Sequence, residues 1–253
     1  MMIELLILSF IQGVTEFLPV SSSSHLIIFS KFSDFAAQSL SIDVSLHIGS
    51  LIAVLTYFHK EIFNFLKNLK LFIKIFVASI PIIIFGFFLV QTNLIQELRN
   101  LKIVGWATLI FGIFLYYSDK FNLKYNVKND FTFRTAIIVG LFQIFALIPG
   151  VSRSGITITA ARLLKFKRVD AAKISFLLSI PTLGAVSIFG LKNIFYSDNL
   201  SFSILNLTSI FLSFIFSYLT IKYFLKYINK FSLDLFVFYR VFLGVTLLII
   251  AYS

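Results

Sequence analysis

The sequence has few charged residues and no cysteine. Asp, Glu, Lys and Arg make up 13% of the 253 residues, against about 25% in a typical soluble domain. The lack of cysteine excludes disulfides, a thiolate nucleophile and cysteine-ligated metals. The polar stretches between apolar segments are shorter than about 20 residues, far less than a separate soluble domain needs. The chain is therefore neither a soluble globular protein nor a disulfide scaffold.

The sequence is correspondingly rich in apolar residues. They make up 58% of the chain, Phe alone contributes 33 residues, and the mean hydropathy is +0.95. A membrane-spanning helix needs about 20 mostly apolar residues. The composition predicts an all-α integral membrane protein with a single polytopic domain over residues 1–253. Six segments are long enough, or nearly so, to span: 43–58, 73–92, 103–118, 171–190, 204–222 and 235–252.

Two further apolar regions, 3–33 and 134–166, are interrupted by polar residues. The first breaks at P-V-S-S-S-S-H (19–25) and the second at P-G-V-S-R-S-G (149–155), and each then resumes for too few residues to cross alone. Irregular backbone at membrane depth is tolerated only inside protein or beside a wet cavity. We therefore predict two re-entrant hairpins, each made of two half-helices that meet at a polar tip.

The two interrupted regions also indicate an internal repeat. Gln12 lies nine residues before Ser21 and Gln143 nine residues before Ser152, an offset of 131 in both cases. The repeats then cover about 1–125 and 132–253, and each holds one hairpin and three spans. Because a hairpin returns to the side it entered from and three spans is an odd number, the second repeat is expected to be inverted in the membrane.

The basic residues mark one side of this topology. The loops 59–74, 119–134, 162–173 and 222–234 fall on the same side and carry sixteen basic and five acidic residues, a net charge of +11. The opposite side carries four basic and five acidic residues. By the positive-inside rule the basic loops are cytoplasmic and both termini lie outside. The basic excess is thus an orientation signal, and we expect no nucleic-acid partner.

Three charges remain within apolar segments: Glu16, Arg153 and Arg240. Charges inside a membrane are costly, so they are usually paired or functional. Glu16 and Arg153 lie at the two predicted tips, which makes them the strongest indication of a site. Arg240 is expected to bond to backbone carbonyls and to be structural.

The polar residues at the tips suit phosphate chemistry. The planar guanidinium of Arg153 can bind two phosphate oxygens at once, and serine-rich backbone that opens a helix directs N–H groups at an anion. Glu16, with Gln12 four residues earlier on the same helix face, offers oxygen ligands to Mg²⁺ or Ca²⁺. His25 can act as a general base or acid, and Ser22, three residues before it, shares its face as an activated nucleophile would.

Three segments resemble a known family. They are Q-G-V-T-E-F-L-P-V-S-S-S-S-H-L at 12–26, P-G-V-S-R-S-G-I-T at 149–157 and D-V-S-L-H-I-G-S-L-I-A-V-L at 43–55. The first two look like the signature segments of bacterial undecaprenyl-diphosphate phosphatases of the bacitracin-resistance type. The resemblance covers essentially the whole chain.

The resemblance implies a multi-pass hydrolase of the bacterial cytoplasmic membrane, with a divalent cation and a C55 isoprenyl diphosphate lipid as substrate. Such an enzyme removes the terminal phosphate and regenerates the carrier for peptidoglycan synthesis. Glu16 would be the metal-linked or acid/base carboxylate, Gln12 its weaker partner and Ser22 the nucleophile. His25 would be the base or acid and Arg153 the phosphate clamp. Further candidate phosphate ligands are Ser21, Ser23, Ser152, Ser154 and Thr157.

Two alternatives stay open at this point. Ser22 attacks the phosphorus after His25 removes its proton, or water bound to the cation attacks directly. The chain could also be a transporter or flippase of isoprenyl phosphates, because inverted repeats are transporter architecture, although a transporter needs no nucleophile and base. The motifs of the unrelated type-2 phosphatidic acid phosphatases are absent from the sequence. The oligomeric state, a homodimer included, is left open.

Overall fold

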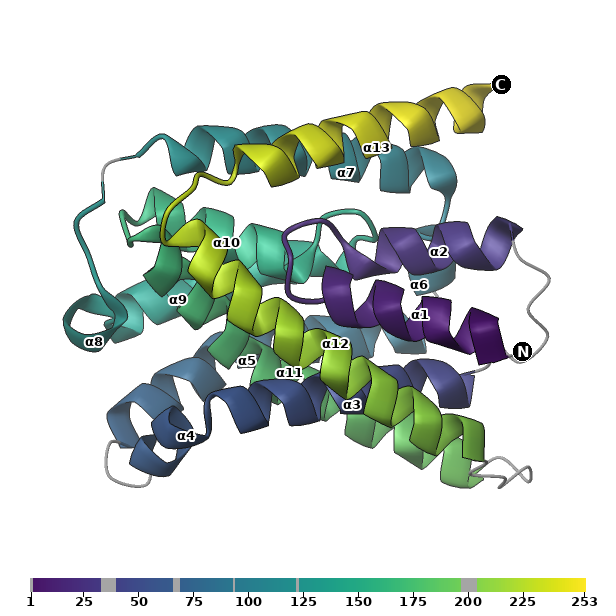
Figure 1. Cartoon of the computed structure of the whole chain (residues 1–253). Coiled ribbons are helices and arrows are strands. Elements are labelled where there is room, and N and C mark those ends of the chain that lie inside the picture. Colours follow the sequence, from purple (N-terminus) through teal and green to yellow (C-terminus); the bar gives the residue numbers. More distant parts are fainter. Residues whose placement is uncertain (1, 33–39, 66–68, 93, 122, 197–203) are drawn as a thin grey trace.

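The computed structural model describes residues 2–32, 40–65, 69–92, 94–121, 123–196 and 204–253. Helices make up most of this part of the chain (Figure 1). The first seven are α1 (Met2–Thr15), α2 (Ser22–Phe32), α3 (Leu40–Tyr57), α4 (His59–Phe65), α5 (Leu69–Gln91), α6 (Leu94–Glu97) and α7 (Leu101–Asp119). They are followed by α8 (Val127–Asp130), α9 (Phe133–Gln143), the 3-10 helix η1 (Ile144–Leu147), α10 (Arg153–Leu163), α11 (Arg168–Tyr196), α12 (Ile204–Ile228) and α13 (Asp234–Tyr252).

Within the described residues, six helices are long and apolar enough to cross a membrane: α3, α5, α7, α11, α12 and α13. Each of them contains one of the six segments expected from the sequence, or all but its last residue. Many of their large apolar side chains are exposed, as in Phe85, Phe87 and Phe88 of α5. Such a surface suits lipid rather than water. The prediction of an all-α protein with six candidate membrane-spanning helices is confirmed for the described residues.

The two interrupted regions each fold as a pair of short helices. α1 packs against α2, and α10 packs against both α9 and η1; in Figure 1 the connection between α1 and α2 lies well inside the outline of the molecule. The second helices begin at Ser22 and Arg153, so His25 and Arg153 are helical, whereas the sequence placed both in the irregular break. The reason is local, because the serine before each helix takes up a backbone N–H that a helix start leaves free.

The two ends of the molecule carry different elements. Both termini lie at one end, and α4 and α8 lie at the other (Figure 1). At the α8 end an ion cluster joins α7, α10 and α11 to the residue that precedes α13. The carboxylate of Asp119, at the end of α7, accepts from Arg162 Nε at 3.0 Å, from Arg168 Nη2 at 2.9 Å and from the backbone N–H of Leu233 at 3.2 Å. Two of the basic residues counted as loop charges are therefore structural partners of one acid.

α12 packs closely on α1 and α3 through small residues. A Cβ on Gly13 would lie 2.5 Å from Phe216 Cβ, and a Cβ on Gly49 would overlap the Ile210 carbonyl oxygen. Ser50 of α3 makes hydroxyl pairs with Ser213 and Ser217 of α12 at 3.2 and 2.9 Å. Close helix approach through small and hydroxyl residues is typical of membrane bundles. This packing holds the helix that carries Gln12.

Candidate active site

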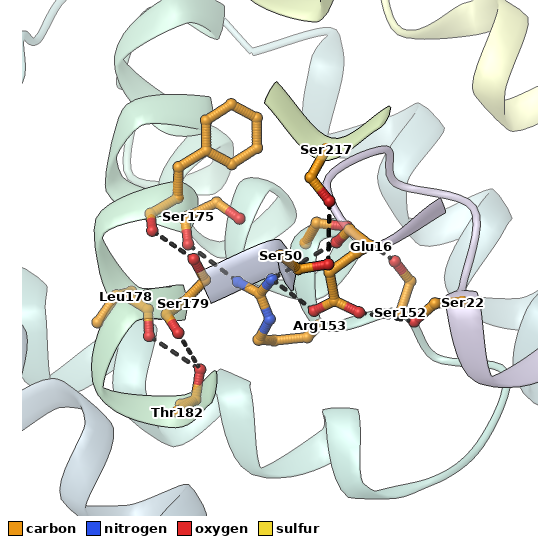
Figure 2. A network of polar contacts seen from close by, with 12 residues as sticks. Glu16, Ser22, Ser50, Ser152, Arg153, Ser175, Leu178, Ser179, Thr182 and Ser217 are labelled. Atoms are coloured by element: carbon orange, nitrogen blue, oxygen red, sulfur yellow. Dashed lines mark hydrogen bonds and ion pairs between the residues drawn. The ribbon is translucent and has the colours of Figure 1, made fainter. Parts of the chain in front are cut away.

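The charges of the two interrupted regions meet in the interior. Arg153 Nη2 lies 3.0 Å from Glu16 Oε1, and the two side chains are only 12% and 7% exposed. A second donor of the same guanidinium, Nη1, bonds to the Ser175 carbonyl of α11 at 3.1 Å (Figure 2). Residues 137 positions apart in the sequence thus form one buried ion pair.

Glu16 is the centre of this site (Figure 2). Its other carboxylate oxygen, Oε2, accepts from Gln12 Nε2 at 3.0 Å and from the Ser22 hydroxyl at 3.0 Å. The Ser22 hydroxyl has a single proton, and here that proton points at a carboxylate. Glu16 is consequently a base in direct contact with the candidate nucleophile.

His25 lies beside the site with different partners from those expected. Nδ1 bonds to the Ser21 carbonyl at 2.7 Å, and because a carbonyl can only accept, Nδ1 carries the ring proton. In the neutral ring Nε2 is then the lone-pair nitrogen, and it bonds to the Tyr239 hydroxyl at 2.5 Å. The two rings are stacked, with their centroids 5.7 Å apart. The expected bond between Ser22 and His25 is not among the hydrogen bonds of the described residues.

The helix starts at the two tips have the same local geometry. Ser21 and Ser152 have φ values of 73° and 70°, a backbone region that residues other than glycine rarely adopt. Each serine hydroxyl accepts the backbone N–H three residues later, at 3.4 Å from Ser24 and 3.1 Å from Gly155. Each also pairs with the hydroxyl two residues later, Ser23 or Ser154, at 3.1 Å. Both starts therefore place the positive end of a helix, which favours an anion, at the point where the apolar region is interrupted.

Two of the candidate phosphate ligands are hydrogen-bonded within the protein instead. The Ser154 hydroxyl donates to the Leu18 carbonyl of the other tip at 2.7 Å. The Thr157 hydroxyl donates to the Arg153 carbonyl at 2.8 Å and lies 2.8 Å from Ser175 Oγ. Both residues are at most 1% exposed. In this structure they brace the site rather than face a ligand.

The oxygen atoms near Glu16 suit a divalent cation that is shared with a substrate. Gln12 Oε1 is buried and has no hydrogen-bond partner in the part of the chain that the structure describes, so it is available as a ligand. The same residues contain no group of three or more His, Asp or Glu side chains able to hold a metal by themselves. Mg²⁺ commonly takes one or two protein oxygens and completes its shell with phosphate oxygens and water.

Two residues of α13 belong to the site and were not predicted there. Tyr239 bonds to His25, 214 positions earlier in the sequence, and nothing in the sequence distinguishes it from the other tyrosines. Arg240 bonds to backbone carbonyls, as expected, but two of these belong to the tips. The one signal available was that Arg240 is a charge within an apolar span.

Comparison with known proteins agrees with the resemblance of the motifs. Residues 5–246 match the family model described as "Bacitracin resistance protein BacA". The undecaprenyl-diphosphatase of Pelagibacter ubique (strain HTCC1062) is 51% identical over 252 residues, which cover 99% of this chain and 98% of that protein. The undecaprenyl-diphosphatases of Dinoroseobacter shibae and Saccharophagus degradans are each 40% identical, over 99% and 94% of this chain and 98% and 93% of their own lengths. This chain therefore belongs to the bacitracin resistance protein BacA family.

Proposed function

We propose that this protein is an undecaprenyl-diphosphatase, which hydrolyses undecaprenyl diphosphate to undecaprenyl phosphate and inorganic phosphate. Membership of the BacA family and the names of its relatives support this function. The structural observation that carries it is the buried carboxylate of Glu16, bonded at once to Arg153 and to the Ser22 hydroxyl. The product returns to cell-wall synthesis, and bacitracin resistance follows from the family. A transporter is not favoured, since it needs no hydroxyl directed at a buried base.

In the proposed mechanism Ser22 Oγ attacks the terminal phosphorus while its proton passes to Glu16 Oε2. The bond from that phosphorus to the bridging oxygen breaks, and undecaprenyl phosphate leaves with the bonding electrons and takes up the proton from Glu16, which becomes a carboxylate again. Water then attacks the phosphoserine and gives its proton to Glu16, which passes it to Ser22 Oγ as the phosphorus–oxygen bond breaks; phosphate is released and the Ser22 hydroxyl is restored. Arg153 and the N–H groups of the two helix starts stabilise the charge on the transferring phosphoryl group. The rival route is direct attack by water that Glu16 activates.

We assign the divalent cation, Mg²⁺ or Ca²⁺, to the oxygens of Glu16 and Gln12. When bound there, it supplies positive charge for the diphosphate oxygens. The unpartnered, buried Gln12 Oε1 is the observation that supports this assignment.

The membrane arrangement is likewise a proposal. α1–α2 and α9–α10 form two re-entrant hairpins, and residues of about 1–125 and 132–253 form inverted repeats. The equal backbone and hydroxyl geometry of Ser21 and Ser152, 131 residues apart, supports the repeat. In a bacterial cytoplasmic membrane the basic loops face the cytoplasm and both termini face outward. A homodimer stays a prediction.

Phosphate release by the purified protein tests the function. With undecaprenyl diphosphate and Mg²⁺ in detergent, the wild-type protein is expected to release one phosphate per lipid, and Glu16→Gln is expected to lose at least about 10³-fold in kcat. No release by the wild type would refute the function.

A second experiment separates the two routes. Ser22→Ala is compared with Ser213→Ala, a buried serine of α12 that donates to the Leu46 carbonyl. The covalent route expects Ser22→Ala to be nearly inactive and Ser213→Ala to be close to wild type. Near-full turnover by Ser22→Ala would eliminate the phosphoserine but leave the hydrolytic function standing.

A further inference from the structure

We propose that Arg240 is a positioning residue of the hydrolytic site, which fixes the spacing of the two tips by bonding to both of them. This inference rests on the proposed phosphatase function. It concerns a residue outside both signature segments, on the last helix of the chain.

The guanidinium of Arg240 bridges three segments. Nη1 donates to the Pro19 carbonyl at 3.4 Å, Nη2 to the Gly150 carbonyl at 2.9 Å and Nε to the Thr108 carbonyl of α7 at 3.2 Å. Pro19 lies three residues after Glu16, and Gly150 lies three residues before Arg153. One rigid group thus connects the backbones that carry the two charges of the site.

The bonded carbonyls explain why an arginine is buried here. Pro19 and Gly150 lie where helices are broken, and such breaks leave carbonyl groups without intrahelical partners, which is unfavourable at membrane depth. Arg240 is 0% exposed, and it donates to both of these carbonyls. A lysine has one compact ammonium group and cannot match the directions of a planar guanidinium.

Arg240 also supplies charge to the site. The Arg153 charge is balanced by Glu16, whereas none of the ion pairs between described residues includes Arg240. The three charges at the tips therefore sum to one positive charge. This net positive charge favours the binding of an anionic diphosphate. The electric field of Arg240 contributes to it without direct contact between the guanidinium and the substrate.

Glycines on the neighbouring helices hold the side chain in place. A Cβ on Gly112 of α7 would lie 3.0 Å from Arg240 Cβ and 3.4 Å from its Nε. A Cβ on Gly155, in the first turn of α10, would lie 2.7 Å from Arg240 Nη1. The stem of Arg240 therefore packs on Gly112, and its guanidinium packs against the start of α10. A small displacement of the side chain at either contact would also displace the two tips.

Arg240→Lys tests the positioning role, with Arg162→Lys as the matched control. Arg162 is equally buried and also donates to carbonyls, of Phe166, Asp119 and Phe121, but at the other end of α10. kcat, KM and thermal stability are measured with undecaprenyl diphosphate on folded protein in detergent. Because a misplacement of about 1 Å can cost about 10²-fold in rate, Arg240→Lys is expected to lose about 10²-fold in kcat with little change in KM.

The control and a neutral variant complete this experiment. Arg162→Lys is expected to lower thermal stability and leave kcat within about twofold. Arg240→Met, which also removes the charge, is expected to raise KM about tenfold in addition to its loss of kcat. The proposal is overturned if Arg240→Lys retains kcat within twofold of the wild type, or if Arg162→Lys loses as much kcat. Wild-type protein that releases no phosphate would instead refute the proposed function.

A pair of glycine variants keeps the proposal testable if Arg240 variants do not fold. Gly112→Ala displaces the stem of Arg240 but retains its charge. Gly105→Ala crowds Leu248 at the same α7–α13 interface, where a Cβ would lie 2.9 Å from the leucine. Both are expected to lower thermal stability, and Gly112→Ala alone is expected to lower kcat, by about tenfold. Equal kcat for the two variants would contradict the positioning role.

Discussion

The Glu16–Arg153 ion pair should contribute to stability in a way that a double-mutant cycle can measure. The variants are Glu16→Gln, Arg153→Gln and the double substitution. At the observed separation of 3.0 Å, an effective dielectric constant of about 20 gives a Coulomb attraction of about 5 to 6 kcal/mol. Loss of water around two nearly buried charges offsets much of this attraction, so the net contribution of the intact pair is small.

Each single variant leaves the other charge buried without its partner. Such a loss costs about 3 to 5 kcal/mol, whereas the double variant removes both charges. We therefore expect the free energy of unfolding to fall by about 3 to 5 kcal/mol in each single variant, and to fall by less in the double variant than in either single variant.

Equilibrium unfolding in mixed detergent micelles, titrated with SDS, measures these free energies. The control cycle combines Glu16→Gln with Arg162→Lys, whose ion partner is Asp119, and its effects should add within about 0.5 kcal/mol. Additive losses for Glu16 and Arg153 would show that the two charges do not depend on each other, and the reasoning about their burial would be wrong.

Three further predictions concern side chains around the site and the frame that holds it. Tyr239→Phe removes the hydroxyl that bonds to His25 Nε2, so kcat should fall about 3- to 10-fold while the melting temperature stays within a few degrees; an unchanged kcat would contradict this. Gly49→Ala places a methyl group against the Ile210 carbonyl and should lower the free energy of unfolding, measured by SDS titration, by about 1 to 3 kcal/mol. An unchanged stability would show that α3 and α12 are not in close contact at this point. Asp119→Asn removes the acid shared by the buried Arg162 and the partly exposed Arg168 and should cost about 3 to 5 kcal/mol in stability, while phosphate release per folded molecule is unchanged.

The sequence predicted the spans and the two tips because these depend on local composition. A run of apolar residues is long enough to cross a bilayer or it is not, and Glu16 and Arg153 stand out as charges in apolar surroundings. The partner of the Ser22 hydroxyl was not predictable in the same way. The spacing of three residues places His25 on the same helix face, yet the proton goes to Glu16 across the break. The partner of the Ser22 hydroxyl depends on the path of the chain between Glu16 and Ser22.

The sequence could not separate charges that mark orientation from charges that form structure. Arg162 and Arg168 were counted with the lysines of the basic loops, but both bind Asp119. Tyr239 and Arg240 reach the tips only because α13 packs on α7. Contacts between such distant segments are properties of the folded bundle and have no local pattern.

The distance of 137 residues between Glu16 and Arg153 has a consequence for synthesis of the protein. At about 5 to 20 residues per second, a ribosome adds Arg153 roughly 7 to 27 seconds after Glu16. Throughout that interval the acid has no cationic partner, and its burial in lipid is unfavourable. Glu16 therefore reaches its native surroundings only after Arg153 has been made, and the nascent chain cannot complete the site before its second half has been synthesised.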